Sequence, residues 1–401
     1  MRSKVIRRVI AGALICTLLA GCGKNVDGLD TNSILQGVVS SVDGTIPKSV
    51  KKDVSKNLIL DADIIAPEKL PQIVRVYRGK PAEFNNFDAV LQTFFPKGDY
   101  TKEIDREAQS TLDGKKQWYN SFTSPDTSGG ETTSVGFSGT PASQPGKDAV
   151  NLSGASSIYG IAPLGDRIFQ ISSEYTNIPG AAQRIRFSDR DLPFMSQEDA
   201  EKKCRDLLDK LKVPIHKTLS RCLVWSHTDA QMQQDALKKG QYLDEKDLIK
   251  DFTQEDDSYT FKFYNEIDGG IVADFLGVSK GMDDSQAAAG STITMVYGKN
   301  GIAAADIQYI YQPTGKAEKE GKPVGFEEAL NQAVRQLNAT VSTYVTTITK
   351  IEFAYAPRRV NHNTEEVLLR PAWIFEYHST STSSEGDRQI LVDALTGKEM
   401  K

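Results

Sequence analysis

The sequence predicts an α+β fold in which helices pack on antiparallel sheets. A pattern of amphipathic helix, strand and then antiparallel strands occurs twice, once from residue 196 and again from residue 326. Short turns join the strands, with Asp-Gly-Gly at 268–270 and Lys-Asn-Gly at 299–301, and Asn-Gly is a strong signal for a tight hairpin. Strands and helices do not alternate as they do in a parallel, Rossmann-like sheet. We therefore expect repeated small modules.

The chain begins with a pattern typical of an exported lipoprotein. Four basic residues precede an apolar run at 9–19, which is shorter than the roughly 20 residues that span a bilayer. The run ends in Leu-Ala-Gly-Cys at 19–22, which resembles the bacterial lipobox. The resemblance implies a signal peptide at 1–21 and a diacylglycerol on Cys22, with or without an N-acyl group. The alternative is an ordinary cleaved signal with a coincidental cysteine, which would leave a soluble secreted protein.

The next segment, residues 22–56, is predicted to be a flexible tether, because its polar and turn residues surround only one short apolar patch. Removal of residues 1–21 takes away four basic and no acidic residues, so 48 Lys+Arg against 53 Asp+Glu become 44 against 53, a net charge of −9. This charge disfavours nucleic acids and anionic lipid headgroups as partners. We expect membrane attachment through lipid, and a protein or cell-wall partner.

An N-terminal α+β domain is expected at 57–192. It includes a loop insertion at 123–156, where 21 of 34 residues are Ser, Thr, Gly or Pro, a composition that does not support a core. The other expected elements are strands at 58–65, 73–77, 157–161, 167–171 and 184–187, and helices at 87–95 and 102–118.

A middle α+β module is expected at 193–315. Ser196 is the predicted N-cap of a helix whose apolar face includes Cys204, and Cys222 lies in the strand that follows. An exported compartment permits a disulfide between the two cysteines, and the alternative is two buried free thiols. The remaining expected elements are a polar helix at 229–252 and strands at 222–225, 259–263, 271–275, 293–297 and 307–311.

A C-terminal module is expected at 316–401. Its amphipathic helix at 326–341 needs an apolar sheet face to cover, which the aromatic residues of a late strand supply. The opposite face of that strand is mixed and is expected to face solvent. The aromatic residues are Trp373, Phe375 and Tyr377, and the opposite face carries Ile374, Glu376 and His378.

The end of the chain resembles two families of extracytoplasmic modules. Pro-Ala-Trp at 371–373 opens a strand and Asp-Ala-Leu-Thr-Gly at 393–397 closes a hairpin, as in PepSY-type and YycH/YycI-type modules. The turn requires Gly397, while the Asp393 side chain can bond nearby backbone N–H groups. The layout also resembles uncharacterised lipoproteins of Gram-positive gut bacteria that contain the domain of unknown function numbered 6034. These resemblances imply a protein on the outer face of the cytoplasmic membrane that binds or restrains an envelope partner.

No catalytic or metal-binding pattern has supporting context, so we expect no cofactor and no metal. Gly-Val-Ser-Lys-Gly at 277–281 has the spacing of a nucleophile elbow but no apolar helix after it. The acidic pairs at 256–257 and 283–284 lack EF-hand spacing and are expected in solvated loops. Ligand spacing is also missing among the four histidines, His216, His227, His362 and His378.

These observations lead to one functional hypothesis and one alternative. The first is a lipid-anchored, extracytoplasmic binding or regulatory protein that is not an enzyme and recognises another envelope component. The alternative is an envelope hydrolase whose catalytic residues come together from distant loops. A cleft that holds a carboxylate or histidine with a strongly shifted pKa would favour the hydrolase. A broad exposed apolar patch would favour the binding protein.

Overall fold

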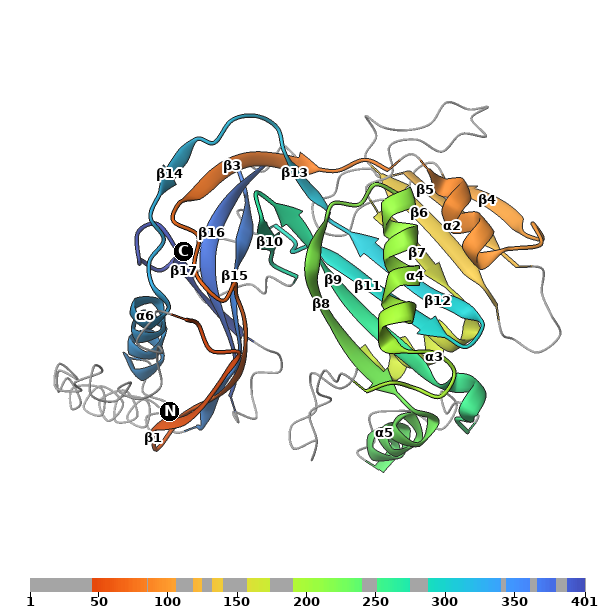
Figure 1. The fold of residues 1–401 in the computed structure, drawn as a ribbon, viewed down its shortest axis with the longest axis horizontal. Helices are drawn as coiled ribbons and strands as arrows, with labels where there is room; N and C mark the ends of the chain where they lie inside the picture. The colour runs from red at the N-terminus through yellow and green to blue at the C-terminus, as the bar shows by residue number, and fades with distance from the viewer. Residues whose placement is uncertain are drawn as a thin grey trace, which may run out of the picture.

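The structure, a computed structural model, combines helices with a large, mainly antiparallel network of strands, which confirms the α+β class (Figure 1). Two groups of strands, named here the middle half-sheet and the terminal half-sheet, are joined by four short or shared strands. The residues that the structure describes are 45–84, 86–105, 118–124, 132–139, 157–173, 190–239, 251–274, 288–339, 344–360, 366–379 and 388–400.

The middle half-sheet is antiparallel throughout its described strands, in the order β4-β5-β6-β7-β12-β11-β9-β8. The predicted tight hairpin at 299–301 is confirmed, because Gly298 pairs with Gly301 across the turn. The strands are β4 (Thr101–Asp105), β5 (Trp118–Thr123), β6 (Ser134–Gly139), β7 (Ser157–Ile161), β8 (Ile215–Trp225), β9 (Ser258–Ile267), β11 (Thr292–Gly298) and β12 (Gly301–Gln308).

The terminal half-sheet brings together strands from both ends of the described chain. β2 pairs in parallel with β15, and β15 pairs with β16 in an antiparallel ladder along its whole length. Residues 49–65 thus share a sheet with residues 346–393, although the sequence suggested different units for them; the boundaries at 192 and 315 stay predictions. The strands are β1 (Ser49–Ser55), β2 (Leu58–Ile65), β15 (Thr346–Arg359), β16 (Val367–Ser379) and β17 (Arg388–Asp393).

Four further strands connect the two half-sheets. β10 forms the predicted hairpin with β9 and also pairs in parallel with β15, so it belongs to both half-sheets. β3 pairs with β13, β14 and β16 along the top of the view in Figure 1. The connecting strands are β3 (Val74–Pro81), β10 (Gly270–Val272), β13 (Tyr311–Pro313) and β14 (Lys319–Gly321).

Residues of five helices share cores with strands of the half-sheets. α2 and α4 share a core with one face of the middle half-sheet, and α3 and α5 share a second core with strands of the same half-sheet. α6 shares a core with the terminal half-sheet and lies on the side of it that faces away from the middle half-sheet (Figure 1). The elements are α2 (Phe87–Phe94), α3 (Pro163–Ser173), α4 (Gln197–Lys210), α5 (His227–Lys239), α6 (Phe326–Ala339) and the 3-10 helix η4 (Gln254–Asp256).

The aromatic face of β16 packs under α6, as the sequence predicts. The rings of Phe326 and Trp373 lie 5.2 Å apart, and Trp373 Nε1 donates to the Val324 carbonyl at 3.1 Å. The prediction for the opposite face of this strand was wrong. Ile374 is fully buried in a core with Tyr264, because β9 and β10 cover that face instead of solvent.

The turn at 393–397 has the geometry that the sequence predicts. Asp393 Oδ1 accepts hydrogen bonds from the N–H groups of Leu395 and Thr396, each at 2.9 Å. Gly397 has φ +67°, in the left-handed region that favours glycine. Arg370 pairs with the Asp393 carboxylate, so the aspartate also ties the turn to β16.

Three other expectations about local structure were wrong. Residues 102–105 were expected in a polar helix and belong to β4, while residues 134–139 were expected in the loop insertion and form β6. In β6, Val135 and Phe137 lie in the core, so two apolar residues suffice for a strand within a polar segment. Residues 167–171 were expected in a strand and belong to α3.

The end of the expected tether is also ordered. Residues 49–55, within the predicted tether at 22–56, form β1 and pair with β2. Val50 and Val54 are both buried in the core beneath α6, because they lie on the same face of the strand. The sequence does not indicate this strand clearly, because Val50 and Val54 are its only apolar residues and the others are polar.

Candidate functional site

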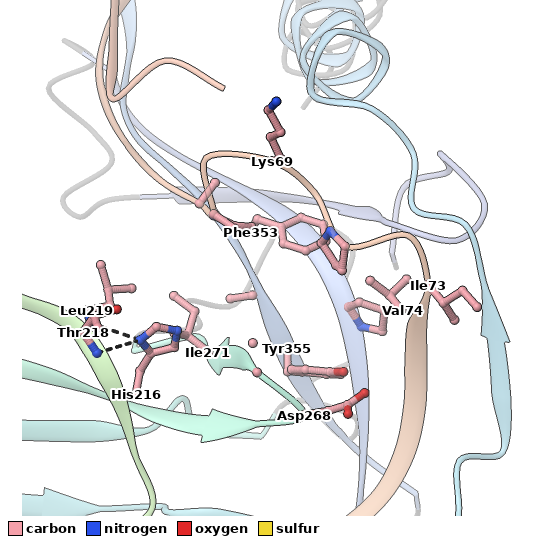
Figure 2. Close-up of a pocket in the computed structure, with 17 residues that line it drawn as sticks. Lys69, Ile73, Val74, His216, Thr218, Leu219, Asp268, Ile271, Phe353 and Tyr355 are labelled. Atoms are coloured by element: carbon pink, nitrogen blue, oxygen red, sulfur yellow. Dashed lines mark hydrogen bonds between the residues drawn. The ribbon is translucent and has the colours of Figure 1, made fainter. Parts of the chain in front are cut away.

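A cavity of about 430 Å³ lies where the two half-sheets meet, and β15 explains its position. One edge of β15 is fully paired with β16. On the other edge, β2 ends with Ile65 opposite Glu352, and the pairing of β10 begins with Ile271 opposite Ala354. Two neighbouring strands therefore meet end to end at Phe353, and the cavity opens at this joint (Figure 2).

The walls of the cavity are mainly apolar. They come from the segment between β2 and β3, the start of β8, the β9–β10 turn and β15. Ile73, at 45% exposure, extends this apolar surface to solvent. Apolar walls with few polar groups are typical of small-molecule sites. The apolar lining residues used below are Pro67, Pro71, Ile73, Leu219, Phe353 and Pro371.

His216 reaches the cavity from an irregular part of β8. The pairing of β8 with β9 is interrupted between Ile215 and Ser220, and such bulges re-aim side chains. His216 Nδ1 accepts hydrogen bonds from the N–H groups of Leu219 at 3.0 Å and Thr218 at 3.4 Å (Figure 2). Arg205 of α4 donates to the His216 carbonyl at 3.1 Å, so main chain and imidazole are both fixed.

The β9–β10 turn contributes Asp268 to the cavity, and Arg75 balances the charge of its carboxylate. Asp268 (φ +52°) and Gly269 (φ +74°) form the turn predicted at 268–270. Asp268 Oδ2 accepts from Arg75 Nη1 at 3.0 Å and from the Tyr77 hydroxyl at 2.9 Å, both on β3. Burial and this carboxylate raise the pKa of Tyr77. The turn, and with it this side of the cavity, is thus anchored to β3.

A second polar feature, named here the ionic cluster, lies between the half-sheets. Lys350 Nζ on β15 lies 2.9 Å from Asp274 Oδ1 and 3.2 Å from Glu376 Oε2 on β16. Lys262 of β9 pairs with the other oxygen of Asp274. The cluster thus links strands of both half-sheets, and its members are Lys262, Asp274, Lys350, Glu352 and Glu376.

Glu352 is the unsatisfied member of the ionic cluster. It is fully buried, its carboxylate lies 3.8 Å from Lys350 Nζ, and neither oxygen has a hydrogen-bond partner among the described residues. Burial, and then the nearby charge of Asp274, raise the pKa of Glu352 to about 7. Burial also tends to raise the pKa of Asp274. The ammonium groups of Lys262 and Lys350 outweigh this effect and hold the pKa of that carboxyl below its usual range.

The structure describes only part of the sequence-predicted site residues. The signal peptide at 1–21, Cys22 and most of the tether lie outside the described residues, as do the 277–281 motif, the acidic pair at 283–284 and His362. Cys204 and Cys222 are not joined by a disulfide and are both buried in the same core, which is the alternative to the bridge. Burial raises the pKa of the Cys204 thiol, so it is poorly reactive.

The acidic pair at 256–257 is not solvated, contrary to expectation. Asp256 pairs with Arg167, and Asp257 Oδ1 lies 2.8 Å from His227 Nδ1 and accepts from the His227 backbone N–H at 2.6 Å. Both aspartates are buried, and their partners are Arg167 of α3 and His227 at the start of α5. Within the described ranges, no group of three or more His, Cys, Asp and Glu side chains is arranged to hold a metal ion.

Sequence reasoning missed the cavity and the ionic cluster. Both depend on contacts between residues far apart in the sequence, for which one sequence offers no signal. Asp268 and Tyr77 are 191 residues apart, and Lys350 and Asp274 are 76 residues apart. His216 was one of four histidines considered, and only the fold distinguishes it. None of the helices in the described part of the chain is long and apolar enough to cross a bilayer.

Comparison with known proteins shows the fold alone. No family model and no curated protein matches the chain. It is similar to an uncharacterised protein from Eubacterium rectale ATCC 33656, seen in a crystal structure, with a TM-score of 0.63 and 15% sequence identity. The similarity covers 93% of this chain and 99% of that chain. A shared fold at this identity leaves function to be argued from the site.

Proposed function

We propose that this chain is a lipid-anchored, extracytoplasmic binding or regulatory protein of the bacterial cell envelope, which recognises another envelope component. The apolar cavity at the joint between β2 and β10 is the observation that carries the proposal. It is concave, its walls are apolar, and the exposed side chain of Ile73 continues them outward. Binding of an apolar ligand or partner to such a surface is favourable, because it removes apolar area from water.

The location and build of the protein are part of the same proposal. The lipobox-like end of the basic and apolar leader supports an acyl anchor on Cys22, at the outer face of the cytoplasmic membrane of a Gram-positive cell. Residues after Cys22 would tether the folded part. We further propose that the helix-covered half-sheets are the repeated small modules expected from the sequence, and that the cavity lies between them because each supplies part of a ligand's surroundings.

The geometry favours binding over hydrolysis. Glu352 has a pKa suited to a general acid, but it is fully buried and is not among the residues that line the cavity. His216 does line the cavity, yet its Nδ1 bonds to backbone N–H groups instead of an orienting carboxylate. A histidine that serves as general base is held by such a carboxylate in the common triads.

Site-specific crosslinking in the native envelope tests the proposal. A photoreactive amino acid at Ile73 should trap a discrete partner or ligand, because this side chain is at the cavity. Met232 on α5 is the matched control, since it is also apolar and exposed, at 61%, but does not line the cavity. Equal products from the two positions, or none from Ile73, would contradict the proposal.

The anchoring part is tested separately. Replacing Cys22 with alanine should abolish globomycin-sensitive processing and move the protein out of the membrane fraction. Unchanged membrane partitioning would contradict the anchor while leaving the cavity as a binding site.

A further inference from the structure

We infer that the cavity binds a small, mainly apolar molecule carrying a carbonyl or carboxylate oxygen, and that this oxygen accepts a hydrogen bond from His216 Nε2. The inference rests on the proposed binding function and adds to it the chemistry of the ligand. Three features of the described lining lead to it: a fixed donor, offset charges and rigid apolar walls.

The donor is set by the hydrogen bonds of the imidazole. Nδ1 of His216 accepts from two backbone N–H groups, so it carries a lone pair and the ring proton of the neutral imidazole lies on Nε2. Figure 2 shows the second ring nitrogen on the side away from Thr218 and Leu219, toward the cavity. An N–H group held in this way selects a ligand atom that accepts a hydrogen bond.

The charged side chains at the cavity do not compete for this role. The carboxylate of Asp268 is directed toward β3, where Arg75 and Tyr77 bond it. Lys69 lines the cavity, but in Figure 2 its ammonium group points away from the other lining residues. A ligand ammonium would therefore meet a donor at His216 and a carboxylate already paired with Arg75. An acceptor oxygen fits this arrangement and an amine does not.

The walls fix the size and character of the rest of the ligand. The volume of about 430 Å³ lies at the lower end of the range of roughly 300–1,000 Å³ typical of small-molecule sites. Pro67, Pro71 and Pro371 give the walls a restricted backbone, and Phe353 offers an aromatic surface. A preformed apolar cavity of this size suits an aryl group or a short branched chain, because little conformational freedom is lost on binding.

Ligand-observed saturation-transfer NMR with three related probes tests the inference. 4-Phenylbutyrate carries a carboxylate, 4-phenylbutanamide carries a neutral carbonyl, and 4-phenylbutylamine has the same apolar part without either oxygen. The protein is the full chain with Cys22→Ala, so that neither an acyl group nor a detergent competes for the cavity. We expect saturation transfer to the acid, the amide or both; the stronger of the two identifies the oxygen that the site prefers. The amine should give none.

Two variants of His216 separate the donor from the packing of the bulge. His216→Asn keeps an acceptor near the position of Nδ1, so the N–H groups of Thr218 and Leu219 stay bonded, but it removes the donor at Nε2. His216→Gln places an amide N–H near the position of Nε2. We expect about tenfold weaker binding of the oxygen-bearing probe by the asparagine variant and a loss of less than about threefold for glutamine.

Several results would overturn the inference. They are no transfer to either oxygen-bearing probe, equal transfer to the amine, or unchanged binding in His216→Asn when circular dichroism shows a native fold. Its failure is distinguishable from failure of the proposed function. Specific crosslinks from Ile73 without binding of these probes would leave an envelope-binding protein with a different ligand.

Discussion

The cavity and the ionic cluster are neighbours on β15, yet they have opposite physical character. Phe353 and Ala354 line an open, apolar space, whereas Lys350 and Glu352 lie one to three residues earlier in a closed, charged one. Both fill the region between the two half-sheets. Side chains two residues apart share a face of a strand, so Ala354 lies on the face of Lys350 and Glu352, and Phe353 lies on the other face. The apolar space therefore begins where the charged side chains on that face end.

The contrast indicates a division of roles at the junction. Charges that are paired in a closed interior hold a particular arrangement of strands, because separating them leaves ions without water or partners. An apolar cavity contributes little to holding the half-sheets together, but its filling by an apolar ligand is favourable. We therefore expect changes in the ionic cluster to affect stability, and changes at the cavity to affect binding.

The largest effect is expected for Lys350→Met. The substitution leaves Asp274, Glu352 and Glu376 without their shared cation, and removal of one partner of a buried ion pair costs about 3–5 kcal/mol. Urea unfolding followed by circular dichroism measures the change in the free energy of unfolding. Lys51→Met is the matched control, because Lys51 pairs with Asp61 at the exposed surface, where such pairs are worth about 0–1 kcal/mol. Equal losses in the two variants would mean that the ionic cluster does not hold the junction.

The next effect is a pH dependence that comes from Glu352. Its pKa is about 7 in the folded protein, above its ordinary value of 4.5. As pH rises from 4.5 to 7, the unfolded chain loses this proton while the folded chain retains it, so the free energy of unfolding falls. The full difference above pH 7 is about 3 kcal/mol.

The variant Glu352→Gln isolates this effect. It removes the proton linkage while keeping the size of the side chain. It should therefore match the wild type near pH 4, become progressively more stable than it between pH 4.5 and 7, and keep the full difference above pH 7. Urea titrations at closely spaced pH values give the two curves. Parallel curves for wild type and variant would show that Glu352 does not titrate in this interval.

The smallest effect on stability is expected at the cavity rim. Ile73→Ser changes a side chain that is 45% exposed, so the free energy of unfolding should change by less than about 0.5 kcal/mol. Binding of the oxygen-bearing probe should nevertheless weaken, because the variant loses apolar contact. Lost stability with unchanged binding in this variant would contradict the expectation that the cavity affects binding and not stability.

Local features were predictable wherever neighbouring residues determine them. The Ser196 cap is formed as expected, with its side chain accepting from the Asp199 N–H, and the turns at 299–301 and 393–397 follow from glycine and side-chain chemistry. Amphipathic helices such as α6 were also recognisable, because many spaced apolar residues determine them. These cases share strong short-range signals.

The wrong predictions concern segments whose structure is determined by few residues or by contacts that are distant in sequence. In α3, Ile168 and Ile171 are both buried at a helical spacing, but the five-residue stretch around them alternates well enough to suggest a strand. Ile374 was expected at the surface because nothing near it in sequence predicts that β9 and β10 will cover it. The candidate site could not be predicted for the same reason, since His216 and Phe353 meet at the cavity only through the fold.

Native mass spectrometry of the chain extracted from its own membrane tests the central claim, that the cavity is a binding site, most directly. Leu219→Trp is the comparison variant, because Leu219 lines the cavity and is not a member of the ionic cluster, so a larger side chain there should fill the cavity. The wild-type protein should carry an additional, discrete non-covalent mass that the variant lacks. The same bound mass in both proteins, or none in either, would contradict the claim.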